Sequence, residues 1–584
     1  MIKLLKNLNK KDLPKILLIL FLVIIQVWLE LKLPDYMSEI TSLVKTEGSP
    51  MSLIIENGIY MLLCAFGSLI SAIFCGYITT SVSSNFSMTL RDKLFEKVQN
   101  LSMNEVKKFS TSSLITRTTN DVIQIEMLIS VGLQLLLKAP IMAIWAITKI
   151  LNKSFKWSIT VVIAVVILLL VIVFLMITVV PKFKIVQKLI DKLNGVIREN
   201  ITGIRIIRAF NAENYQENKF EKVNNDLTKL QLFNQKTFAI MSPIMYLVMN
   251  GLTLSIYLIG ANLIDGALME NKIVLFGDMV VFSSYAMQII MSFLMLAMIF
   301  MILPRAGVSA SRINEVLDSD ISVKNGTLKE NKTNLKGTIE FKNVSFKYPD
   351  AEEYLLKNIS FKINQGETVA FIGSTGSGKS TLINLIPRFY DVTEGEILID
   401  GINVKEYDLK YLYTKIGYIS QKAVLFSGTI KSNVAYGNNN ISLDKVKEAI
   451  EIAQGNDFVL KLENKYDSEI AQRGTNLSGG QKQRLSIARA IAKDPEIYIF
   501  DDSFSALDYK TDSNLRKELK KYTSKATTLI VAQRIGTIMN SDKIIVLDEG
   551  KIASIGKHNE LLKNCDVYRQ IAESQLSKEE LENA

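Results

Sequence analysis

A phosphate-binding loop is the clearest chemical motif in this sequence. Residues 373–380 read G-x-x-x-x-G-K-S, after an apolar run that predicts a strand and before a pattern that predicts a helix. Backbone N–H groups of such a loop surround a polyphosphate, and a lysine and a hydroxyl complete the site. Lys379 is therefore expected to reach the β- and γ-phosphates, and Ser380 to hold Mg²⁺. The predicted phosphate-binding residues are Gly373, Ser374, Thr375, Gly376, Ser377, Gly378, Lys379, Ser380 and Thr381.

A second motif supplies carboxylates for the same chemistry. Residues 496–502 read E-I-Y-I-F-D-D, an apolar strand that ends in two acidic residues. In phosphate-loop NTPases an aspartate in this position holds Mg²⁺. Asp501 is expected to do so here through water, together with Ser380.

The apolar residues that must anchor this machinery are concentrated in residues 1–305. Six segments are long enough to cross about 30 Å of hydrocarbon at roughly 20 residues each. The predicted spans are 16–33, 53–80, 127–150, 157–180, 238–264 and 273–303. Pro140 and Pro243 fall inside spans and are expected to kink them. The centres of the spans carry almost no ionisable side chains, which argues against a proton relay or an ion-selective path.

The distribution of charge predicts the orientation in the membrane. The net charge is +10, and Lys and Arg are concentrated in residues 1–15, 83–126 and 183–235. These segments should be cytoplasmic, with both termini inside a multi-pass protein of the cytoplasmic membrane. The long connections show helical spacing and are read as extensions of the spanning helices. Basic charge in this setting fits attraction to anionic lipid, and we expect no nucleic-acid partner.

Two smaller features complete the list of candidates. Methionines recur on one helix face in the fifth and sixth spans, and they either line an adaptable apolar cavity or pack between helices. These residues are Met241, Met245, Met249, Met287, Met291, Met295 and Met298. The one histidine, His558, stands in a polar segment and is expected on the surface.

Residues 477–481 read L-S-G-G-Q and lie between the phosphate-binding loop and the carboxylate motif. This sequence resembles the signature of ATP-binding cassette (ABC) proteins. Tyr348 looks like the aromatic residue that stacks on adenine, and Gln421 looks like the Q-loop residue that also approaches Mg²⁺. The segments 113–121 and 199–205 are similar to cytoplasmic loops of six-span ABC exporters. The expected signature and D-loop residues are Leu477, Ser478, Gly479, Gly480 and Gln481, and Ser505, Ala506, Leu507 and Asp508.

The resemblance is nearly full length and implies a fold and an activity. We expect an α-helical membrane domain of six transmembrane helices that extend into the cytoplasm, fused to an α/β phosphate-loop ATPase domain. The expected boundaries are 1–305 for the membrane domain, 306–337 for a linker and 338–584 for the nucleotide-binding domain. The implied cofactors are ATP and Mg²⁺. Dimerisation is implied too, with each ATP between one subunit's phosphate loop and the other's signature.

Two positions depart from the family pattern, and both belong to the same ATP site. Asp502 stands where the family has the catalytic Glu, and its carboxylate is one methylene closer to the backbone. A displacement of about 1 Å can cost roughly 100-fold in rate. Gln533 replaces the switch histidine, and its amide can donate a hydrogen bond but carries no charge. The signature is intact, so we expect half of a heterodimer that binds ATP at a degenerate site and completes its partner's active site.

The expected partner is a second ABC half-transporter with Glu and His in its ATPase site. Alternative interpretations are a slow homodimeric exporter, a peptide exporter, and a nucleotide-gated membrane regulator. The near absence of charge in the spans suggests a small apolar or amphiphilic cargo, such as a drug in multidrug efflux or a lipid.

Overall fold

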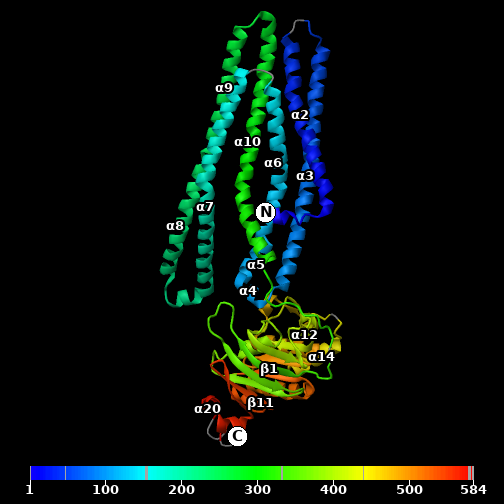
Figure 1. Ribbon diagram of the computed structural model, residues 1–584, viewed down its shortest axis with the longest axis vertical. Coiled ribbons are helices and arrows are strands. Elements are labelled where there is room, and N and C mark those ends of the chain that lie inside the picture. Colours follow the sequence, from blue (N-terminus) through cyan, green and yellow to red (C-terminus); the bar gives the residue numbers. More distant parts are fainter. Residues whose placement is uncertain are drawn as a thin grey trace. The chain divides into compact units, whose positions relative to one another are not determined.

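Long helices make up the first of two units into which the chain divides (Figure 1). The computed structural model describes residues 2–45, 48–151, 155–330, 333–438, 440–576 and 581. The helical unit comprises Met1–Gln99 and Ser110–Ser319, and the sheet unit comprises Asn100–Phe109 and Asp320–Ala584.

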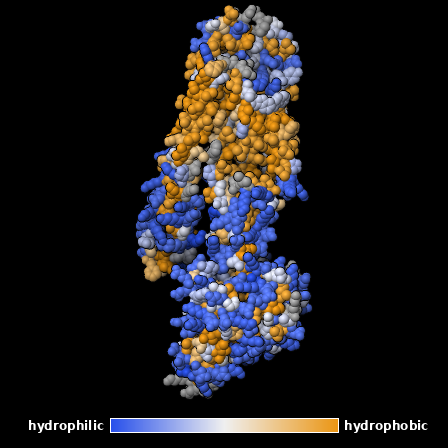
Figure 2. Space-filling model, viewed as in Figure 1, coloured by the Kyte–Doolittle hydropathy of each residue, from blue (hydrophilic) through white to orange (hydrophobic). Residues whose placement is uncertain are grey.

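Among the described residues of the helical unit, six helical stretches are long and apolar enough to span a membrane, which confirms the predicted number. On the face seen in Figure 2, hydrophobic residues cover much of the upper stretch of these helices, whereas their lower ends are mostly hydrophilic. The unit contains α1 (Ile2–Leu5), a 3-10 turn (Lys10–Asp12), α2 (Leu13–Lys45), α3 (Met51–Asn100), α5 (Thr111–Thr118), α6 (Asn120–Leu151), α7 (Phe155–Ala209), α8 (Glu213–Ala239), α9 (Met241–Asp265) and α10 (Met269–Leu317).

Several of these helices are much longer than a bilayer requires. Helix α7 has 55 residues, which at about 1.5 Å per residue corresponds to roughly 80 Å. Helix α10 runs to Leu317, within the segment 306–337 that the sequence suggests as a linker. Pro140 is accommodated inside α6, whereas Pro243 is the third residue of α9, just after the break at Ile240. Proline is tolerated in a first turn because its missing N–H has no helical partner there.

The methionine rows pack differently in the two helices. Met245 is buried, and Met241 and Met249 are partly buried against the apolar core of the helical unit. Met291 and Met298 on α10 are exposed in this chain.

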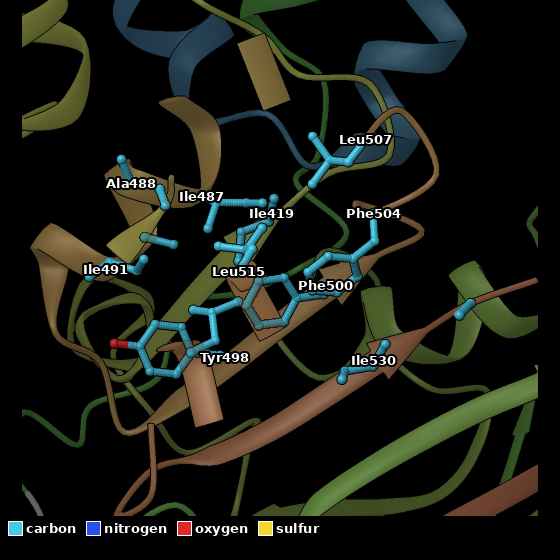
Figure 3. Packing of buried hydrophobic residues seen from close by; sticks show 14 of the residues in the cluster. Ile419, Ile487, Ala488, Ile491, Tyr498, Phe500, Phe504, Leu507, Leu515 and Ile530 are labelled. Carbon is cyan, nitrogen blue, oxygen red and sulfur yellow. The ribbon is translucent and has the colours of Figure 1, made fainter. Parts of the chain in front are cut away.

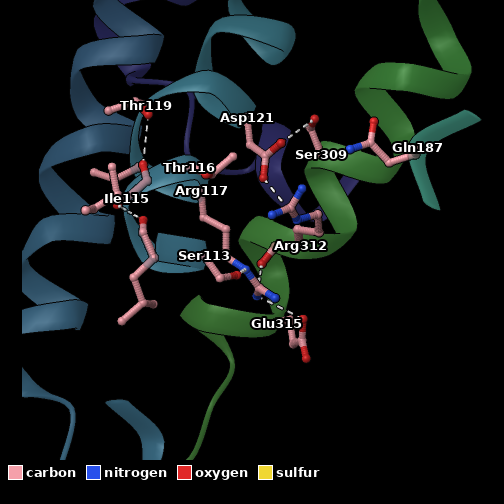
Figure 4. A network of polar contacts seen from close by, with 12 residues as sticks. Ser113, Ile115, Thr116, Arg117, Thr119, Asp121, Gln187, Ser309, Arg312 and Glu315 are labelled. Carbon is pink, nitrogen blue, oxygen red and sulfur yellow. Dashed lines mark hydrogen bonds and ion pairs between the residues drawn. The ribbon is translucent and has the colours of Figure 1, made fainter. Parts of the chain in front are cut away.

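A polar network connects α5 and the start of α6 to the end of α10 (Figure 4). Arg117 of α5 donates to the backbone carbonyl of Arg312 at 2.8 Å and pairs with Glu315 at 2.8 Å. Asp121 accepts from Ser309 at 2.9 Å and pairs with Arg312 at 3.3 Å. Arg117 and Asp121 belong to the segment 113–121 singled out in the sequence. Their partners are almost two hundred residues away in the chain.

Two larger sheets and one small one form the framework of the sheet unit. The six-stranded sheet has the order β12-β11-β3-β10-β9-β6 and is parallel except for β12, and an antiparallel four-stranded sheet has the order β2-β1-β4-β5. The short strands β7 and β8 pair with each other. The strands are β1 (Ile339–Phe346), β2 (Leu356–Ile363), β3 (Thr368–Gly373), β4 (Glu394–Ile399), β5 (Ile402–Asn403), β6 (Ile416–Ile419), β7 (Gly428–Thr429), β8 (Glu469–Ile470), β9 (Ile497–Asp501), β10 (Thr527–Val531), β11 (Lys543–Asp548) and β12 (Lys551–Gly556).

Helices cover the parallel sheet, and the strands between them read as continuous apolar runs because both faces are buried. All five residues of β9 are buried. Figure 3 shows Tyr498 and Phe500 of β9 packed with Ile487 and Ile491 of α16. The helices are α4 (Met103–Phe109), α11 (Lys379–Leu385), α12 (Leu409–Lys415), α13 (Ile430–Val434), α14 (Leu443–Ile452), α15 (Asn456–Val459), α16 (Gly479–Lys493), α17 (Tyr509–Tyr522), α18 (Ile535–Ile538), α19 (His558–Asn564) and α20 (Asp566–Glu573), with 3-10 turns at Lys465–Asp467 and Gln472–Gly474.

The expectation that His558 lies on the surface is wrong. Its side chain is buried at the start of α19, and its Nδ1 lies 2.6 Å from the hydroxyl of Tyr568 in α20. Burial lowers the pKa of His558, because the imidazolium would lose its hydration. The polar residues around His558 in the sequence suggested exposure, but His558 contacts Tyr568, ten residues further along, on the next helix.

Candidate nucleotide-binding site

The phosphate-binding loop connects β3 to α11 in the strand-loop-helix order that its motif requires. Gly373 has φ +154°, and a methyl group there would lie 2.0 Å from the carbonyl oxygen of Leu547 on the neighbouring strand. Gly378 has φ +95°, and a methyl group there would lie 2.7 Å from the side chain of Leu356. Glycine at these two positions lets the backbone turn tightly beneath a ligand.

Lys379 folds back over the loop and donates three hydrogen bonds to it. Its Nζ lies 2.9 Å from the carbonyl oxygen of Gly373, 2.7 Å from that of Ser374 and 3.3 Å from the hydroxyl of Ser377. Burial lowers the pKa of Lys379, and the nearby Asp502 and Asp501 oppose that shift. The ammonium is therefore held at the loop, where an anionic ligand could take over its hydrogen bonds.

Ser380 and Asp501 meet, as two ligands of one cation should. The Ser380 hydroxyl donates to Oδ1 of Asp501 at 2.9 Å, and Asp501 ends the buried strand β9. Burial raises the pKa of Asp501, Asp502 adds to the shift, and the hydrogen bond from Ser380 opposes it. A buried carboxylate and a hydroxyl are oxygen donors of the kind that Mg²⁺ prefers, so these residues fit the ion. A divalent cation would also favour the ionised carboxylate.

Asp502 accepts hydrogen bonds from both glutamines that the sequence assigns to this site. Gln421 Nε2 lies 3.2 Å from Oδ2 of Asp502, and Gln533 Nε2 lies 3.1 Å from the same oxygen. Asp502 itself has φ 48°, in the left-handed region that Asp tolerates better than most residues. A cavity of about 290 Å³ opens beside it, lined among others by Ser505, Gln533 and Arg534.

Tyr348 lies beside the loop, and a cation covers its ring. Its hydroxyl is 3.0 Å from the hydroxyl of Thr381, the residue after the phosphate loop. Nζ of Lys107, from α4 of the same unit, lies 4.5 Å from the centroid of the Tyr348 ring and 5.3 Å from that of Tyr390. A hydrogen bond to Tyr390 raises the pKa of Lys107 despite partial burial. The aromatic platform thus carries an ammonium in this structure.

The signature residues lie at the N-terminus of α16 and contact the D-loop. Ser478 caps the helix in a capping box with Gln481. A methyl group on Gly480 would lie 3.3 Å from the carbonyl oxygen of Ala506, while one on Gly479 would meet nothing within 4 Å. Asp508 caps α17 and accepts from the N–H of Thr511. Within the described part of the chain, no hydrogen bond joins Leu477–Gln481 to the phosphate loop.

Sequence reasoning missed two residues of the site. The Tyr418 hydroxyl lies 3.5 Å from Oδ2 of Asp501 and donates to Asn384 at 2.9 Å, and Lys107 covers Tyr348. Tyr418 lies in the quoted segment of Gln421, but nothing marked its role. Lys107 lies 241 residues from Tyr348, and no local pattern links them.

Comparisons with known proteins agree with this geometry. Residues 356–505 match the family model described as ABC transporter, and residues 16–293 match the ABC transporter transmembrane region. The chain is 38% identical over 504 residues to the uncharacterized ABC transporter ATP-binding protein YfiB of Bacillus subtilis, covering 86% of each chain. It is 31% identical over 522 residues to an ATP-dependent lipid A-core flippase of Syntrophus aciditrophicus, covering 87% of this chain and 83% of that one.

A solved structure shows the same fold. The structure of a bacterial Atm1-family ABC exporter with ATP bound matches with a TM-score of 0.84 and 24% identity, over 97% of this chain and 98% of the other. A phosphate-loop ATPase domain joined on one chain to six membrane-spanning helices defines a transporter driven by ATP hydrolysis. The chain belongs to the ABC transporter family, as an exporter half-transporter.

The cation over Tyr348 leads to a prediction about nucleotide affinity. Replacing Lys107 by Ala should tighten ATP binding to this chain, because the ammonium occupies the ring on which adenine is expected to stack. A cation–π contact at a partly exposed site is worth about 0.5–1 kcal/mol, so a two- to fivefold fall in Kd is expected. Equilibrium titration with a fluorescent ATP analogue measures it.

Lys108→Ala is the matched control, because it removes an adjacent exposed lysine of α4. Equal or weaker binding by Lys107→Ala would show that Lys107 does not compete with the nucleotide.

Proposed function

We propose that this chain is the degenerate-site half of a heterodimeric ABC exporter that moves a lipophilic or amphiphilic compound, a drug or a lipid, out across the cytoplasmic membrane. The observation that carries the proposal is the state of Asp502. Its Oδ2 accepts both glutamine amides, one of which comes from the position of the switch histidine.

The ATP of this site is assigned to the phosphate loop and Tyr348. Residues 373–381 take the phosphates, with Lys379 on the β- and γ-phosphates, and Tyr348 stacks on adenine. Ser380, Gln421 and Asp501 hold Mg²⁺, which neutralises developing charge when bound. Support comes from the Ser380–Asp501 hydrogen bond and from the fit of this oxygen donor set to the ion.

Weak hydrolysis at this site follows from the side chains beside Asp501. An aspartate holds a water farther from the γ-phosphate than a glutamate does, and here two amides already occupy one of its oxygens. Gln533 supplies a neutral donor where the family has an imidazole. Because a positioned general base contributes roughly 10²–10⁴-fold, its displacement should leave a site that binds ATP and turns it over slowly.

The signature has the opposite role in the proposal. Ser478 and Gly479 are exposed in this chain, and space around Gly479 is open. These are the properties expected of a surface that receives a partner's γ-phosphate. The D-loop, Ser505–Asp508, lies next to it, since a methyl group on Gly480 would be 3.3 Å from the carbonyl oxygen of Ala506.

The cargo and the orientation complete the proposal. The membrane domain is assigned to residues 1–305, the linker to 306–337 and the ATPase domain to 338–584. Lys and Arg in the long connections favour cytoplasmic termini. The relative that is named a lipid A-core flippase supports an amphiphilic cargo.

The test compares the chain alone with the chain co-expressed with a half-transporter that carries Glu and His. Alone, it should show very low ATPase activity and poor transport, and co-expression should restore both. Steady-state ATPase in detergent and dye efflux from vesicles measure these two activities. A homodimer that turns over ATP on the order of 1–10 times per second would contradict the heterodimer proposal.

A further inference from the structure

A cluster of polar side chains lies among the apolar residues of the helical unit. Lys138 of α6 forms an ion pair with Oε1 of Glu30 on α2 at 2.9 Å. Gln26 of α2 and Ser68 of α3 donate to the same oxygen at 3.0 and 3.1 Å. The amide of Gln288 on α10 donates to the backbone carbonyl of Glu30 at 3.3 Å. We call these five residues the Glu30 cluster.

The cluster lies at membrane depth. Its residues are roughly 20–28 Å along their helices from the ends at Lys45, Met51, Leu151 and Met269, at about 1.5 Å per residue. A hydrocarbon layer about 30 Å thick that begins at these ends of the helices would contain the whole cluster. Ionisable groups at such depth are costly, face a protein interior or a wet cavity, and mark functional sites. The expectation that the spans are almost free of charge at their centres overlooked Lys138, which lies in the middle of the predicted span 127–150.

Several hydrogen-bonding positions of the cluster have no partner among the described residues. Oε1 of Gln26 and Oε1 of Gln288 are buried without a hydrogen-bond partner, and Gln26 as a whole is only 4% exposed. Both amides must turn their nitrogens toward Glu30, so their oxygens point to other positions. All three donors to the Glu30 carboxylate reach Oε1, which leaves Oε2 available. Buried acceptors without donors are unfavourable, and a ligand with N–H groups would satisfy them.

The charges restrict the kind of ligand further. Glu30 and Lys138 together are neutral, so a bound cation or a bound anion would leave one uncompensated charge at membrane depth. A bound zwitterion would leave no uncompensated charge. Its ammonium can donate to Oε2 of Glu30 and to the glutamine oxygens, and its anionic group can pair with Lys138, whose side chain is 14% exposed.

We propose that the Glu30 cluster binds the head group of a zwitterionic amphiphile whose ammonium carries N–H donors. This proposal rests on the proposed export of an amphiphile and adds the class of head group. The four helices that supply the cluster fix the positions of its charged side chains. The apolar helix surfaces around the cluster would contact the hydrocarbon chain.

The experiment measures binding of three single-chain phospholipids of equal chain length to the purified complex of this chain and its partner, without nucleotide. Lysophosphatidylethanolamine has a zwitterionic head with N–H donors, lysophosphatidylcholine has the same charges without them, and lysophosphatidylglycerol is anionic. Kd for the ethanolamine lipid should be about tenfold lower than for either of the others. Equal Kd values for the three lipids would overturn the proposal.

The double variant Glu30→Gln, Lys138→Met keeps the site neutral and should reduce the tenfold preference to about one, while hydrocarbon binding persists. The matched control is Asp35→Asn, Lys149→Met, which removes another ion pair between the same two helices, at 2.8 Å. It should keep the preference. A preference that survives in the Glu30 and Lys138 variant would place the head group elsewhere. Absence of the tenfold preference in the unmodified complex, with ATP-driven efflux of other amphiphiles intact, counts against this site only, whereas selective binding without ATP-driven transport counts against export only.

Discussion

Gly479→Asp in this chain should reduce the steady-state ATPase activity of the proposed heterodimer, purified as a complex, by about 100-fold or more, whereas Asp502→Asn should leave most of it. The glycine lies in the signature, where backbone N–H groups and the Ser478 hydroxyl would stabilise the partner's γ-phosphate. The added carboxylate repels the phosphate and should displace it from these donors, and loss of one preorganised donor contact costs about 10²–10³-fold. In the proposed function Asp502 is a poorly placed base, so replacing its carboxylate by an amide should remove little activity.

The local structure makes this comparison interpretable. Space around Gly479 is open, and aspartate is favourable in the first turn of a helix such as α16. The substitution should therefore not unfold the sheet unit, and an unchanged unfolding temperature is the control. If Asp502→Asn abolished hydrolysis while Gly479→Asp left it intact, the roles of the two sites would be reversed.

Restoring the family residues should create a second working site. In a complex whose partner carries Gln in place of its catalytic Glu, Asp502→Glu with Gln533→His in this chain should raise the residual ATPase activity by about 100-fold. The longer side chain moves the carboxylate toward the attacking water, and a positioned base contributes roughly 10²–10⁴-fold. The histidine restores an imidazole at the γ-phosphate.

The single variants serve as controls for the double variant. Asp502→Glu alone should gain less, because Gln533 would still donate to the carboxylate. The left-handed φ of 48° at residue 502 favours Asp over Glu, so a slightly lower unfolding temperature is also expected. No gain in the double variant would mean that the block to hydrolysis lies outside these two side chains.

Motifs that are continuous in sequence predicted the centre of the site, because spacing within one strand, loop and helix fixes where those residues lie. Ser380 and Asp501 were expected to share a cation, and the structure places them in contact. Contacts between distant segments were not predictable in this way. Three such contacts depend on how whole segments pack: those of Arg117 with Glu315, Lys107 with Tyr348, and Glu30 with Lys138.

Some of the missing information was nonetheless visible in the sequence. A lysine in the middle of an apolar span, such as Lys138, requires a partner at membrane depth. The sequence does not show that this partner is Glu30, because that depends on how α2 packs against α6. Similarly, the sequence after residue 305 predicted a linker, whereas helix α10 continues to Leu317.

The ammonium above Tyr348 has a thermodynamic consequence for α4. Since Lys107 and a purine ring would compete for one aromatic face, the apparent dissociation constant for ATP equals the intrinsic constant divided by the fraction of time that the face is bare. Linkage is reciprocal, so ATP binding must disfavour the docked position of Lys107 by the same factor. Residues 101–109 follow α3 directly in the chain, and they would therefore gain or lose one anchoring contact each time the site fills or empties.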